Sequence, residues 1–205
     1  MTELVFYTNP QSRGRIVRRM LQECGVPYET RVVEYGPQMK SAPYTDINPM
    51  GKVPAIACKG KVVTECAAII AWLAETFPQA ELAPVEEERA DYYRWLFFAA
   101  GPLESAIINR ALGVEIHADK QGFVGYGSFD LAVRTISDAV DRYPWITGER
   151  FTAADVYVGS QIGYGLMFGT LPENEALRNY WERVSTRPAW QQAEEMDNAL
   201  MPKQP

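Results

Sequence analysis

Histidine, cysteine and long apolar runs are scarce in this 205-residue sequence, and each shortage excludes a class of protein. The single histidine, His117, excludes a histidine-rich metal site and leaves a Ser-His-Asp hydrolase only one residue as its base. The three cysteines, Cys24, Cys58 and Cys66, form no CxxC pair and no zinc-ligand spacing, which favours free thiols in a reducing cytoplasm. The most continuous apolar run, 66–74, is far shorter than the roughly 20 residues that span a bilayer, so we expect no membrane segment. The first seven residues lack the basic and apolar regions of a signal peptide.

Positive charge is also in short supply, with 20 lysine and arginine residues against 26 aspartate and glutamate residues. A general nucleic-acid binder needs a basic face to displace phosphate counterions, so nucleic acid is not an expected partner of this acidic chain. Glu115, His117 and Asp119 alternate as metal ligands can, but short patterns of this kind often arise by chance, and we expect no metal. The apolar fraction of 47% is typical of a globular protein with a sizeable core.

Strand and helix patterns alternate over the first 77 residues. We expect an amphipathic helix that ends at Gly25, an apolar helix at 65–77, and strands at 4–7, 28–33, 53–57 and 61–64. On the amphipathic helix the apolar side chains share one face, and the arginines at 13, 15, 18 and 19 fall mostly elsewhere. Lys59-Gly60 forms a tight turn between the last two strands. The order β-α-β, an irregular crossover and then β-β-α matches a thioredoxin-like α/β domain.

Helical patterns dominate the rest of the chain. Residues 78–85 contain two prolines and interrupt the pattern, so we interpret them as a linker between a domain at 1–77 and an all-helical domain at 86–205. We expect a long helix at 86–116 with a kink at Gly101-Pro102, helices at 122–143 and 153–169, and shorter ones beginning near Pro172 and Pro188. Thr152 and Asp155 form a capping-box pattern that starts the helix at 153–169.

Four segments carry a resemblance to a known family: FYTNPQSRGR at 6–15, NPMGKVPAI at 48–56, TECAAI at 64–69 and GERFTAAD at 148–155. In this order and with these separations, the set resembles the cytosolic glutathione transferases of the bacterial type. The resemblance implies a thioredoxin-like glutathione-binding domain followed by an all-α domain, with glutathione as co-substrate and no metal. It also implies a small hydrophobic electrophile as second substrate, a role in detoxification, and a symmetric homodimer whose interface contains the helix from Glu86 onward.

The resemblance further implies which residues bind glutathione, an anionic peptide with two carboxylates and a thiol. Val53-Pro54 stands at the family's cis-proline position, where the backbone before the proline pairs with the cysteinyl main chain of glutathione. Glu65 and Cys66 begin a helix whose N–H groups favour the γ-glutamyl carboxylate, with Glu65 near the ammonium group. Many family members carry serine or threonine where this chain has Cys66. A thiol is a weaker donor than a hydroxyl, and a small buried hydrophobe is the alternative interpretation of Cys66.

Two lysines, Lys40 and Lys52, flank the irregular crossover and can meet the glycyl carboxylate of glutathione. Exposed lysines are usually just solvated, so the assignment of either one depends on its position. Lys52 is the better candidate because it immediately precedes Val53-Pro54.

The group that activates the thiol is open between Ser12, Tyr7 and Asn9. Family members use a tyrosine, serine or cysteine near the first turn to hydrogen-bond the glutathione sulfur. We favour Ser12, which stands where the first helix begins, as in the serine and cysteine classes, although a serine there is often only a cap. Tyr7 ends the first strand, as in the tyrosine classes, but two extra residues separate it from Arg13-Gly14, and such a tyrosine is often simple core.

The function implied by the resemblance is a glutathione transferase, in which the glutathione thiolate attacks a hydrophobic electrophile. A glutathione-dependent disulfide reductase or peroxidase is the alternative on the same fold, and Ser12 in place of cysteine argues against a mixed disulfide at that position. A non-catalytic binding module is the alternative from another class. The intact Lys52-Val53-Pro54 and Glu65-Cys66 segments argue against it, because a retired site need not retain them.

Overall fold

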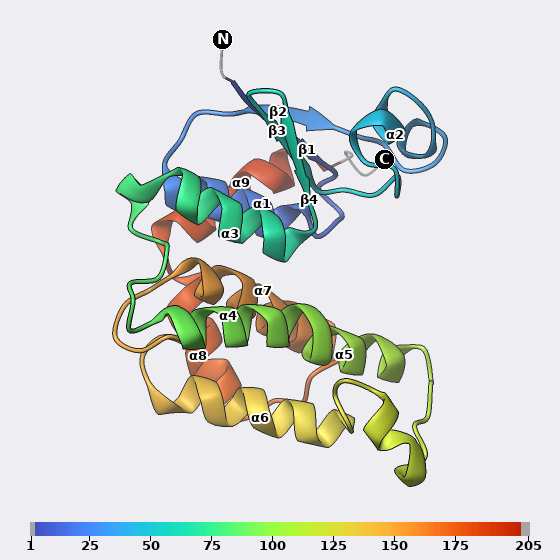
Figure 1. Ribbon diagram of the computed structural model, residues 1–205, viewed down its shortest axis with the longest axis vertical. Coiled ribbons are helices and arrows are strands. Elements are labelled where there is room, and N and C mark those ends of the chain that lie inside the picture. Colours follow the sequence, from blue (N-terminus) through green and yellow to red (C-terminus); the bar gives the residue numbers. More distant parts are fainter. Residues whose placement is uncertain (1–2, 202–205) are drawn as a thin grey trace. The chain divides into compact units, whose positions relative to one another are not determined.

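The computed structural model describes residues 3–201, which form two compact units. One unit contains residues 3–83 together with 187–201, and the other contains residues 84–186 (Figure 1). The sequence placed every residue after the linker in one helical domain. The structure instead packs the last helix, α9 (Pro188–Ala199), against α1 (Gly14–Cys24) of the first unit. Contacts between segments so far apart along the chain leave no local pattern in the sequence.

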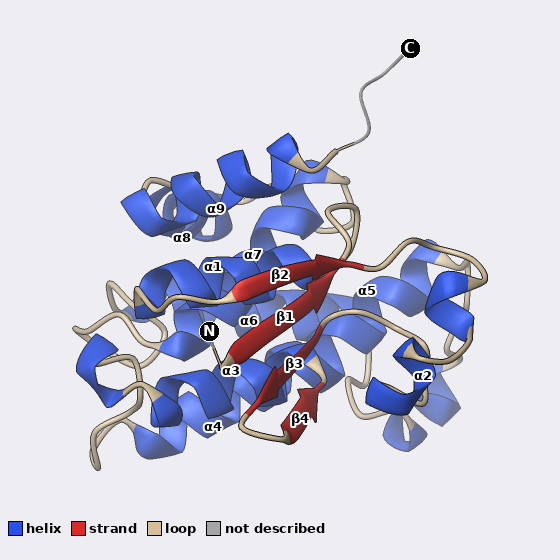
Figure 2. Cartoon of the chain, turned by 90° about the horizontal axis from the view of Figure 1, so that it is seen from above, coloured by secondary structure: helices blue, strands red, loops and turns tan. Residues whose placement is uncertain are grey.

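The first unit is built on a four-stranded sheet in the order β2-β1-β3-β4 (Figure 2). Its strands are β1 (Leu4–Thr8), β2 (Glu29–Val32), β3 (Ala55–Cys58) and β4 (Lys61–Thr64). β1 runs parallel to β2 and antiparallel to β3, and β4 is the hairpin partner of β3. This arrangement confirms the predicted thioredoxin-like domain, with strand ends shifted by only one or two residues from the prediction.

Helix α1 packs against both α3 (Cys66–Thr76) and α9. Its buried apolar side chains are the ones that the periodicity predicted: Ile16, Val17, Met20, Leu21 and Cys24. The helix ends where Gly25 takes a φ of 64° and donates its N–H to the carbonyls of Leu21 and Gln22. Arg18 and Arg19 are 1% and 2% exposed, although the sequence pattern places the arginines mostly off the apolar face of the helix. Their ion pairs with α9 explain the burial.

Short elements fill the remaining connections of the first unit. The crossover from β2 to β3 contains η1 (Gln38–Lys40) and α2 (Tyr44–Ile47), and η2 (Pro78–Ala80) follows α3. The crossover packs on the sheet through a small apolar cluster of Tyr7, Val33, Met39, Tyr44 and Ala55. Successive side chains of a strand point to opposite faces, so Phe6 lies on the other face of the sheet from Tyr7. The Arg18 guanidinium carbon lies 5.1 Å from the centre of the Phe6 ring.

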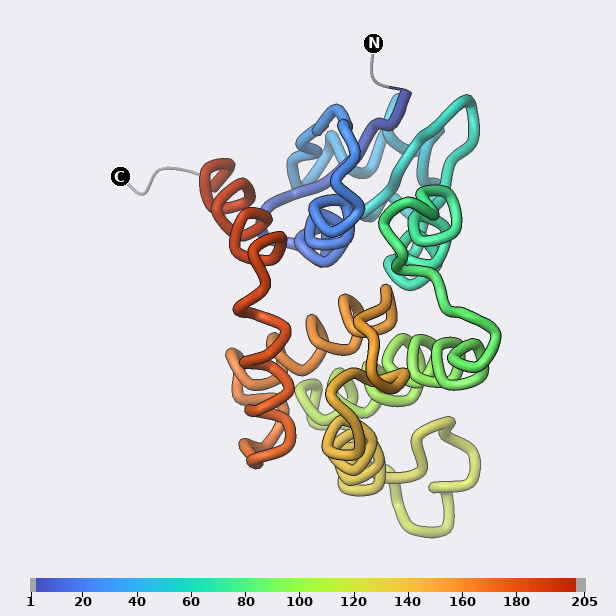
Figure 3. Tube along the Cα trace, turned by 90° about the vertical axis from the view of Figure 1, so that its left-hand side faces the viewer, coloured from blue at the N-terminus to red at the C-terminus, as the bar shows by residue number. Residues whose placement is uncertain are grey.

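The second unit is helical, as the sequence predicted (Figure 3). Its elements are α4 (Arg89–Phe98), η3 (Ala99–Leu103), α5 (Glu104–Ala111), η4 (Ala118–Phe123), α6 (Phe129–Arg142), α7 (Ala153–Met167) and α8 (Glu175–Ser185). The predicted kink site at Pro102 lies inside the π-helical turn η3.

Three helix ends in this unit differ from the prediction. The helix expected at 86–116 ends at Ala111, and the one expected from residue 122 begins at Phe129, where Ser128 accepts a hydrogen bond from the Leu131 N–H at 3.2 Å. The helix expected near Pro172 begins at Glu175, because Asn174 caps it through the Leu177 N–H at 2.8 Å. At the starts of α6 and α8, the side-chain caps Ser128 and Asn174 override the apolar pattern.

The start of α7 confirms the predicted capping box of Thr152 and Asp155. Asp155 is completely buried, and its carboxylate accepts hydrogen bonds from the Thr152 N–H at 2.8 Å and the Ile146 N–H at 2.7 Å. The Tyr180 hydroxyl of α8 donates to the same carboxylate at 2.7 Å. Burial raises the pKa of Asp155, although these donors oppose the effect. One side chain thus connects the start of α7 to the preceding loop and to α8.

Candidate functional site

One edge of the sheet in the first unit collects the segments that the sequence singled out. In the register of the sheet, Tyr7 of β1 lies opposite Ala55 of β3, and Ala55 lies opposite Thr64 of β4. The chain therefore leaves β1, enters β3 and leaves β4 at the same edge. The segments that follow or precede these residues are the turn at 9–13, the pair Val53-Pro54 and the pair Glu65-Cys66.

The turn after β1 is held in one shape by Asn9, which is 3% exposed. Its side-chain Nδ2 donates to the Val33 carbonyl at 3.1 Å, and its Oδ1 accepts from the Gln11 N–H at 3.0 Å. Its backbone carbonyl accepts from both the N–H and the hydroxyl of Ser12, at 3.0 and 2.7 Å. Since both ends of the Asn9 amide are engaged within the protein, its role here is to hold the turn.

Ser12 is half-buried at the start of α1 and is part of the same hydrogen-bond network. Its Oγ donates to the Asn9 carbonyl and accepts from the Gly14 N–H at 2.9 Å. A hydroxyl rotates freely about its C–O bond, so the Ser12 proton can turn to another acceptor while the oxygen stays in place. The close approach of α1 to β1 requires Gly14, because a Cβ there would lie 2.0 Å from the Thr8 Oγ1.

The start of α3 meets the start of α1. Cys66 is 8% exposed, and its Sγ donates to the Arg13 carbonyl at 3.6 Å. Glu65 is exposed and has a φ of 67° and a ψ of 121°, an unfavourable conformation for a residue other than glycine. The side chain of Glu65, the N-cap residue, makes no capping hydrogen bond, and the first turn of α3 carries no acidic residue. The N–H groups and dipole of this helix start favour an anion.

The two candidate lysines make different contacts in the loop before β3. The Val53-Pro54 peptide bond is cis, as the resemblance implied. Lys52 has an exposed side chain, and its carbonyl accepts from the Tyr44 hydroxyl at 2.6 Å and from the Asn48 Nδ2 at 2.7 Å. Lys40 instead donates its Nζ to backbone carbonyls of the same loop, Gly51 at 2.6 Å and Met50 at 3.1 Å. This geometry favours Lys52 for contact with a carboxylate and gives Lys40 a loop-holding role.

The segments at this edge of the sheet are similar in sequence and fold to parts of known proteins. The family model described as "Glutathione S-transferase, N-terminal domain" matches residues 13–76. A glutathione S-transferase, GST-4.5, of Xanthomonas campestris is 27% identical over 160 residues, which cover 74% of this chain and 78% of that protein. The structure of a glutathione transferase from Methylococcus capsulatus is 24% identical and superposes with a TM-score of 0.78 over 96% of this chain and 99% of that one.

Residues 13–76 form the N-terminal domain of the glutathione transferase family, and the chain has the glutathione transferase fold. Relatives of similar closeness carry other activities in their names. The disulfide-bond oxidoreductase YfcG of Escherichia coli is 27% identical over 91% of this chain and 92% of its own length. The maleylacetoacetate isomerase of Pseudomonas aeruginosa is 26% identical over 86% of this chain and 88% of its own length. These likenesses therefore leave the particular reaction to be argued from the site.

Within this glutathione transferase fold, Tyr7 and Ser12 occupy different environments. Tyr7 is 8% exposed, and its ring packs on Tyr44 with 5.8 Å between ring centres. Its hydroxyl accepts a hydrogen bond from Arg31 Nη1 at 3.3 Å. Tyr7 therefore fits the core interpretation of a strand-ending tyrosine, whereas Ser12 lies beside the meeting point of α1 and α3. The assignment of Ser12 as the activating group remains a prediction.

Sequence reasoning missed two residues, Tyr44 and Asn48, that shape the loop before β3. Tyr44 and Asn48 both donate to the Lys52 carbonyl, and burial raises the pKa of Tyr44 to about 12, so the phenol stays neutral and keeps its proton. An aromatic residue and an asparagine in an irregular segment carry no distinctive spacing. Asn48 begins one of the segments that carry the resemblance, but the partner of its side chain depends on the fold.

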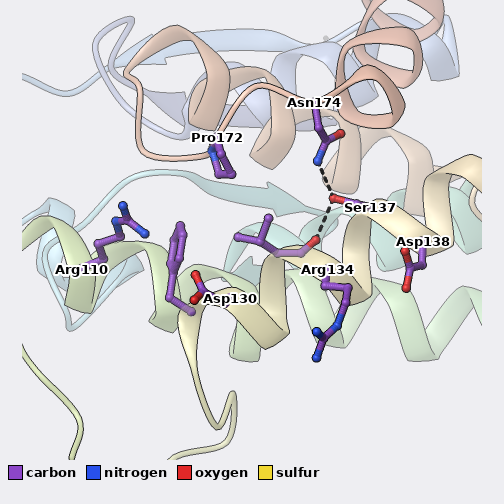
Figure 4. A pocket seen from close by; sticks show the side chains of 9 residues that line it. Arg110, Asp130, Arg134, Ser137, Asp138, Pro172 and Asn174 are labelled. Atoms are coloured by element: carbon purple, nitrogen blue, oxygen red, sulfur yellow. Dashed lines mark hydrogen bonds between the residues drawn. The ribbon is translucent and has the colours of Figure 1, made fainter.

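The second unit has a pocket of its own, between α5, α6 and the loop before α8 (Figure 4). It is lined by Arg110, Phe129, Asp130, Val133, Arg134, Ser137, Asp138, Pro172 and Asn174. Asn174 donates to the Ser137 hydroxyl at 2.8 Å, and the charged side chains at 130, 134 and 138 are of both signs and exposed. This balance of charge selects no class of ligand.

Among residues 3–201, no group of three or more histidine, cysteine, aspartate or glutamate side chains is arranged to hold a metal ion. No helix in the same range is long and apolar enough to cross a membrane.

Proposed function

We propose that this chain binds glutathione at the edge of its sheet and activates the thiol for attack on a small hydrophobic electrophile. The observation that carries the proposal is the contact between the Cys66 Sγ and the Arg13 carbonyl, which joins the start of α3 to the turn that holds Ser12. An anion-favouring helix start and a hydroxyl thus lie on neighbouring segments. The structure of a related fold from Sulfitobacter, described with bound glutathione, supports the choice of ligand (TM-score 0.76, 18% identity, 98% of this chain and 100% of that one).

Each segment of the edge has a proposed role in holding the peptide. The start of α3 receives the γ-glutamyl carboxylate through its N–H groups, and Glu65 receives the ammonium group. The backbone of Val53, before Pro54, pairs with the cysteinyl main chain as an added strand does. Lys52 receives the glycyl carboxylate, while Lys40 supports the loop through its bonds to the carbonyls at 50 and 51.

The proposed chemistry requires the thiol to ionise near neutral pH. A free thiol has a pKa of about 8.5, and lowering it by two requires roughly 2.7 kcal/mol of extra stabilisation of the thiolate. A hydrogen bond from Ser12 to the thiolate supplies about 1.5–3 kcal/mol, and the dipole at the start of α3 adds about 0.3–1 kcal/mol. The thiolate sulfur then forms a bond to the electrophilic carbon, and the leaving group departs with the electron pair of the bond that breaks.

A disulfide reductase is the second candidate, because the YfcG relative spans nearly the whole chain. In that reaction the glutathione thiolate attacks a disulfide sulfur, and one thiolate leaves, so the same activation of the thiol is needed. The two reactions differ in whether the electrophilic atom is carbon or sulfur. A panel of aryl halides, epoxides, peroxides and mixed disulfides, each assayed with glutathione, distinguishes them.

Calorimetric titration with glutathione is the first test of the proposal. We expect saturable binding that weakens in the Lys52→Ala variant, and turnover of an aryl halide or an epoxide faster than of mixed disulfides. Turnover of mixed disulfides alone would favour the reductase. Absence of glutathione binding to the wild-type chain would support a non-catalytic module and contradict both enzymatic candidates.

We also propose a symmetric homodimer with α4 in its interface and a cytoplasmic location. Support for the interface comes from α4 itself, where Tyr93 and Phe97 are exposed at 36% and 62% with their rings stacked 6.3 Å apart. Exposed stacked aromatics on one helix are the kind of surface that a two-fold interface buries twice.

A further inference from the structure

Helix α9 is fastened to α1 by ion pairs within the first unit. Arg18 Nε lies 2.7 Å from Asp197 Oδ1, and both side chains are 1% exposed. Arg19 Nη2 lies 3.2 Å from Glu194 Oε1, one turn earlier on α9. A buried pair tolerates little displacement, because moving one partner leaves the other charged and desolvated. The position of α9 along α1 is therefore fixed at Asp197.

The residue after Asp197 extends this connection toward the turn that holds Ser12. Asn198 Oδ1 accepts a hydrogen bond from Arg15 Nη2 at 2.8 Å. The same guanidinium donates its Nε to the Pro10 carbonyl at 2.6 Å. Because the guanidinium is planar and rigid, its two donors fix the distance between α9 and the Pro10 carbonyl.

Pro10 lies in the turn between Asn9 and Ser12, so the turn is held from two sides. Asn9 anchors one side to the Val33 carbonyl, and Arg15 holds the Pro10 carbonyl on the other. We propose that Arg15 and Asn198 are positioning residues, which hold the turn at 9–13 so that the Ser12 hydroxyl reaches the glutathione thiolate. This inference rests on the proposed function and deepens it, since it makes the C-terminal helix part of the thiol-activating site.

A different role for Arg15 predicts different behaviour. If its charge alone stabilised the thiolate, lysine would substitute well, and Asn198 would not matter. We call the link from Asn198 through Arg15 to the Pro10 carbonyl the Arg15 bridge. If this bridge positions Ser12, Arg15→Lys does not restore thiol activation, because a single nitrogen on a flexible stem cannot hold the Pro10 carbonyl and Asn198 in a fixed geometry. Asn198→Asp keeps the acceptor for Arg15, whereas Asn198→Ala removes it.

The test measures the pKa of the bound glutathione thiol by thiolate absorbance, together with kcat and KM for conjugation, in four full-length variants. We expect Arg15→Lys and Asn198→Ala to raise that pKa and lower kcat about two- to tenfold, with the KM for glutathione little changed. Asn198→Asp should stay close to the wild type. Glu195→Ala, an exposed neighbour on α9, is the matched control and should show no change.

A second readout needs no glutathione. The Arg15–Asn198 pair is solvent-exposed, so Asn198→Ala should shift the melting temperature by no more than about 2 °C. Hydrogen exchange in peptides that cover residues 10–14 should nevertheless speed up roughly threefold or more. Unchanged exchange and an unchanged thiol pKa in both Arg15→Lys and Asn198→Ala would overturn the bridge. If the wild type binds no glutathione, the proposed function fails, and the exchange experiment still decides whether the bridge holds the turn.

Discussion

Replacing Asp155 by alanine should destabilise the second unit more than most single substitutions do. The substitution leaves the buried N–H groups of Thr152 and Ile146 and the hydroxyl of Tyr180 without their shared acceptor. An unsatisfied buried donor costs about 1–3 kcal/mol, and allowing for partial rescue by water we expect a total loss of roughly 3–5 kcal/mol. At about 2–4 °C per kcal/mol for a chain of this size, the melting temperature should fall by about 6–20 °C.

Thermal unfolding followed by circular dichroism and by calorimetry measures this loss, and two further variants calibrate it. Tyr180→Phe removes only one donor from the Asp155 carboxylate, so we expect a loss of about 1 kcal/mol. Asp141→Ala removes an exposed carboxylate on α6 and should change the free energy of unfolding by less than about 0.5 kcal/mol. A loss in Asp155→Ala no larger than that in Asp141→Ala would refute the view that this carboxylate connects α7 to its neighbours.

Three other expectations concern assembly, binding and thiol chemistry. The wild-type mass by light scattering at micromolar concentration should be twice the 23.1 kDa of the chain, and Phe97→Glu should lower it; a monomeric wild type would contradict the proposed interface. Calorimetry should show a larger loss of glutathione affinity in Lys52→Ala and Glu65→Ala than in Cys66→Ala, because a lost ionic contact costs more than a lost thiol donor. Burial raises the pKa of the Cys24 thiol to about 12, so iodoacetamide at pH 8 should leave Cys24 unmodified in the native protein and modify it after denaturation.

Local patterns predicted most of the first unit because its strands and helices are specified by neighbouring residues. The turn at Lys59-Gly60, the stop at Gly25 and the apolar face of α1 are all short-range signals, and each appears in the structure. The burial of Arg18 could not be predicted in this way, because the carboxylate that pairs with it belongs to Asp197, far along the chain. The placement of α9 in the first unit was missed for the same reason.

In the candidate site, too, the sequence pointed to short segments but not to the contacts between residues far apart along the chain. The sequence singled out Val53-Pro54, Glu65 and Cys66 as candidates, and strand register explains why they lie at one edge of the sheet. It named both Lys40 and Lys52 for the glycyl carboxylate and ranked Lys52 higher, but only the fold reveals that the Lys40 ammonium bonds the carbonyl of Gly51. The helix expected from residue 122 was wrong at its start, where several glycines interrupt an otherwise suitable apolar pattern.

The pKa of glutathione bound to the Ser12→Ala variant is the most direct test of the proposed activation. Because a hydrogen bond to a charged group contributes about 1.5–3 kcal/mol, removing the hydroxyl should raise the pKa of the bound thiol by about 1–2 and slow conjugation roughly ten- to hundredfold near neutral pH. Glutathione affinity should change little, since the proposed binding contacts lie elsewhere. Tyr7→Phe, which removes a hydroxyl from a core residue, should leave the thiol pKa unchanged. A raised pKa in Tyr7→Phe together with an unchanged pKa in Ser12→Ala would contradict the account and reduce Ser12 to a cap of α1.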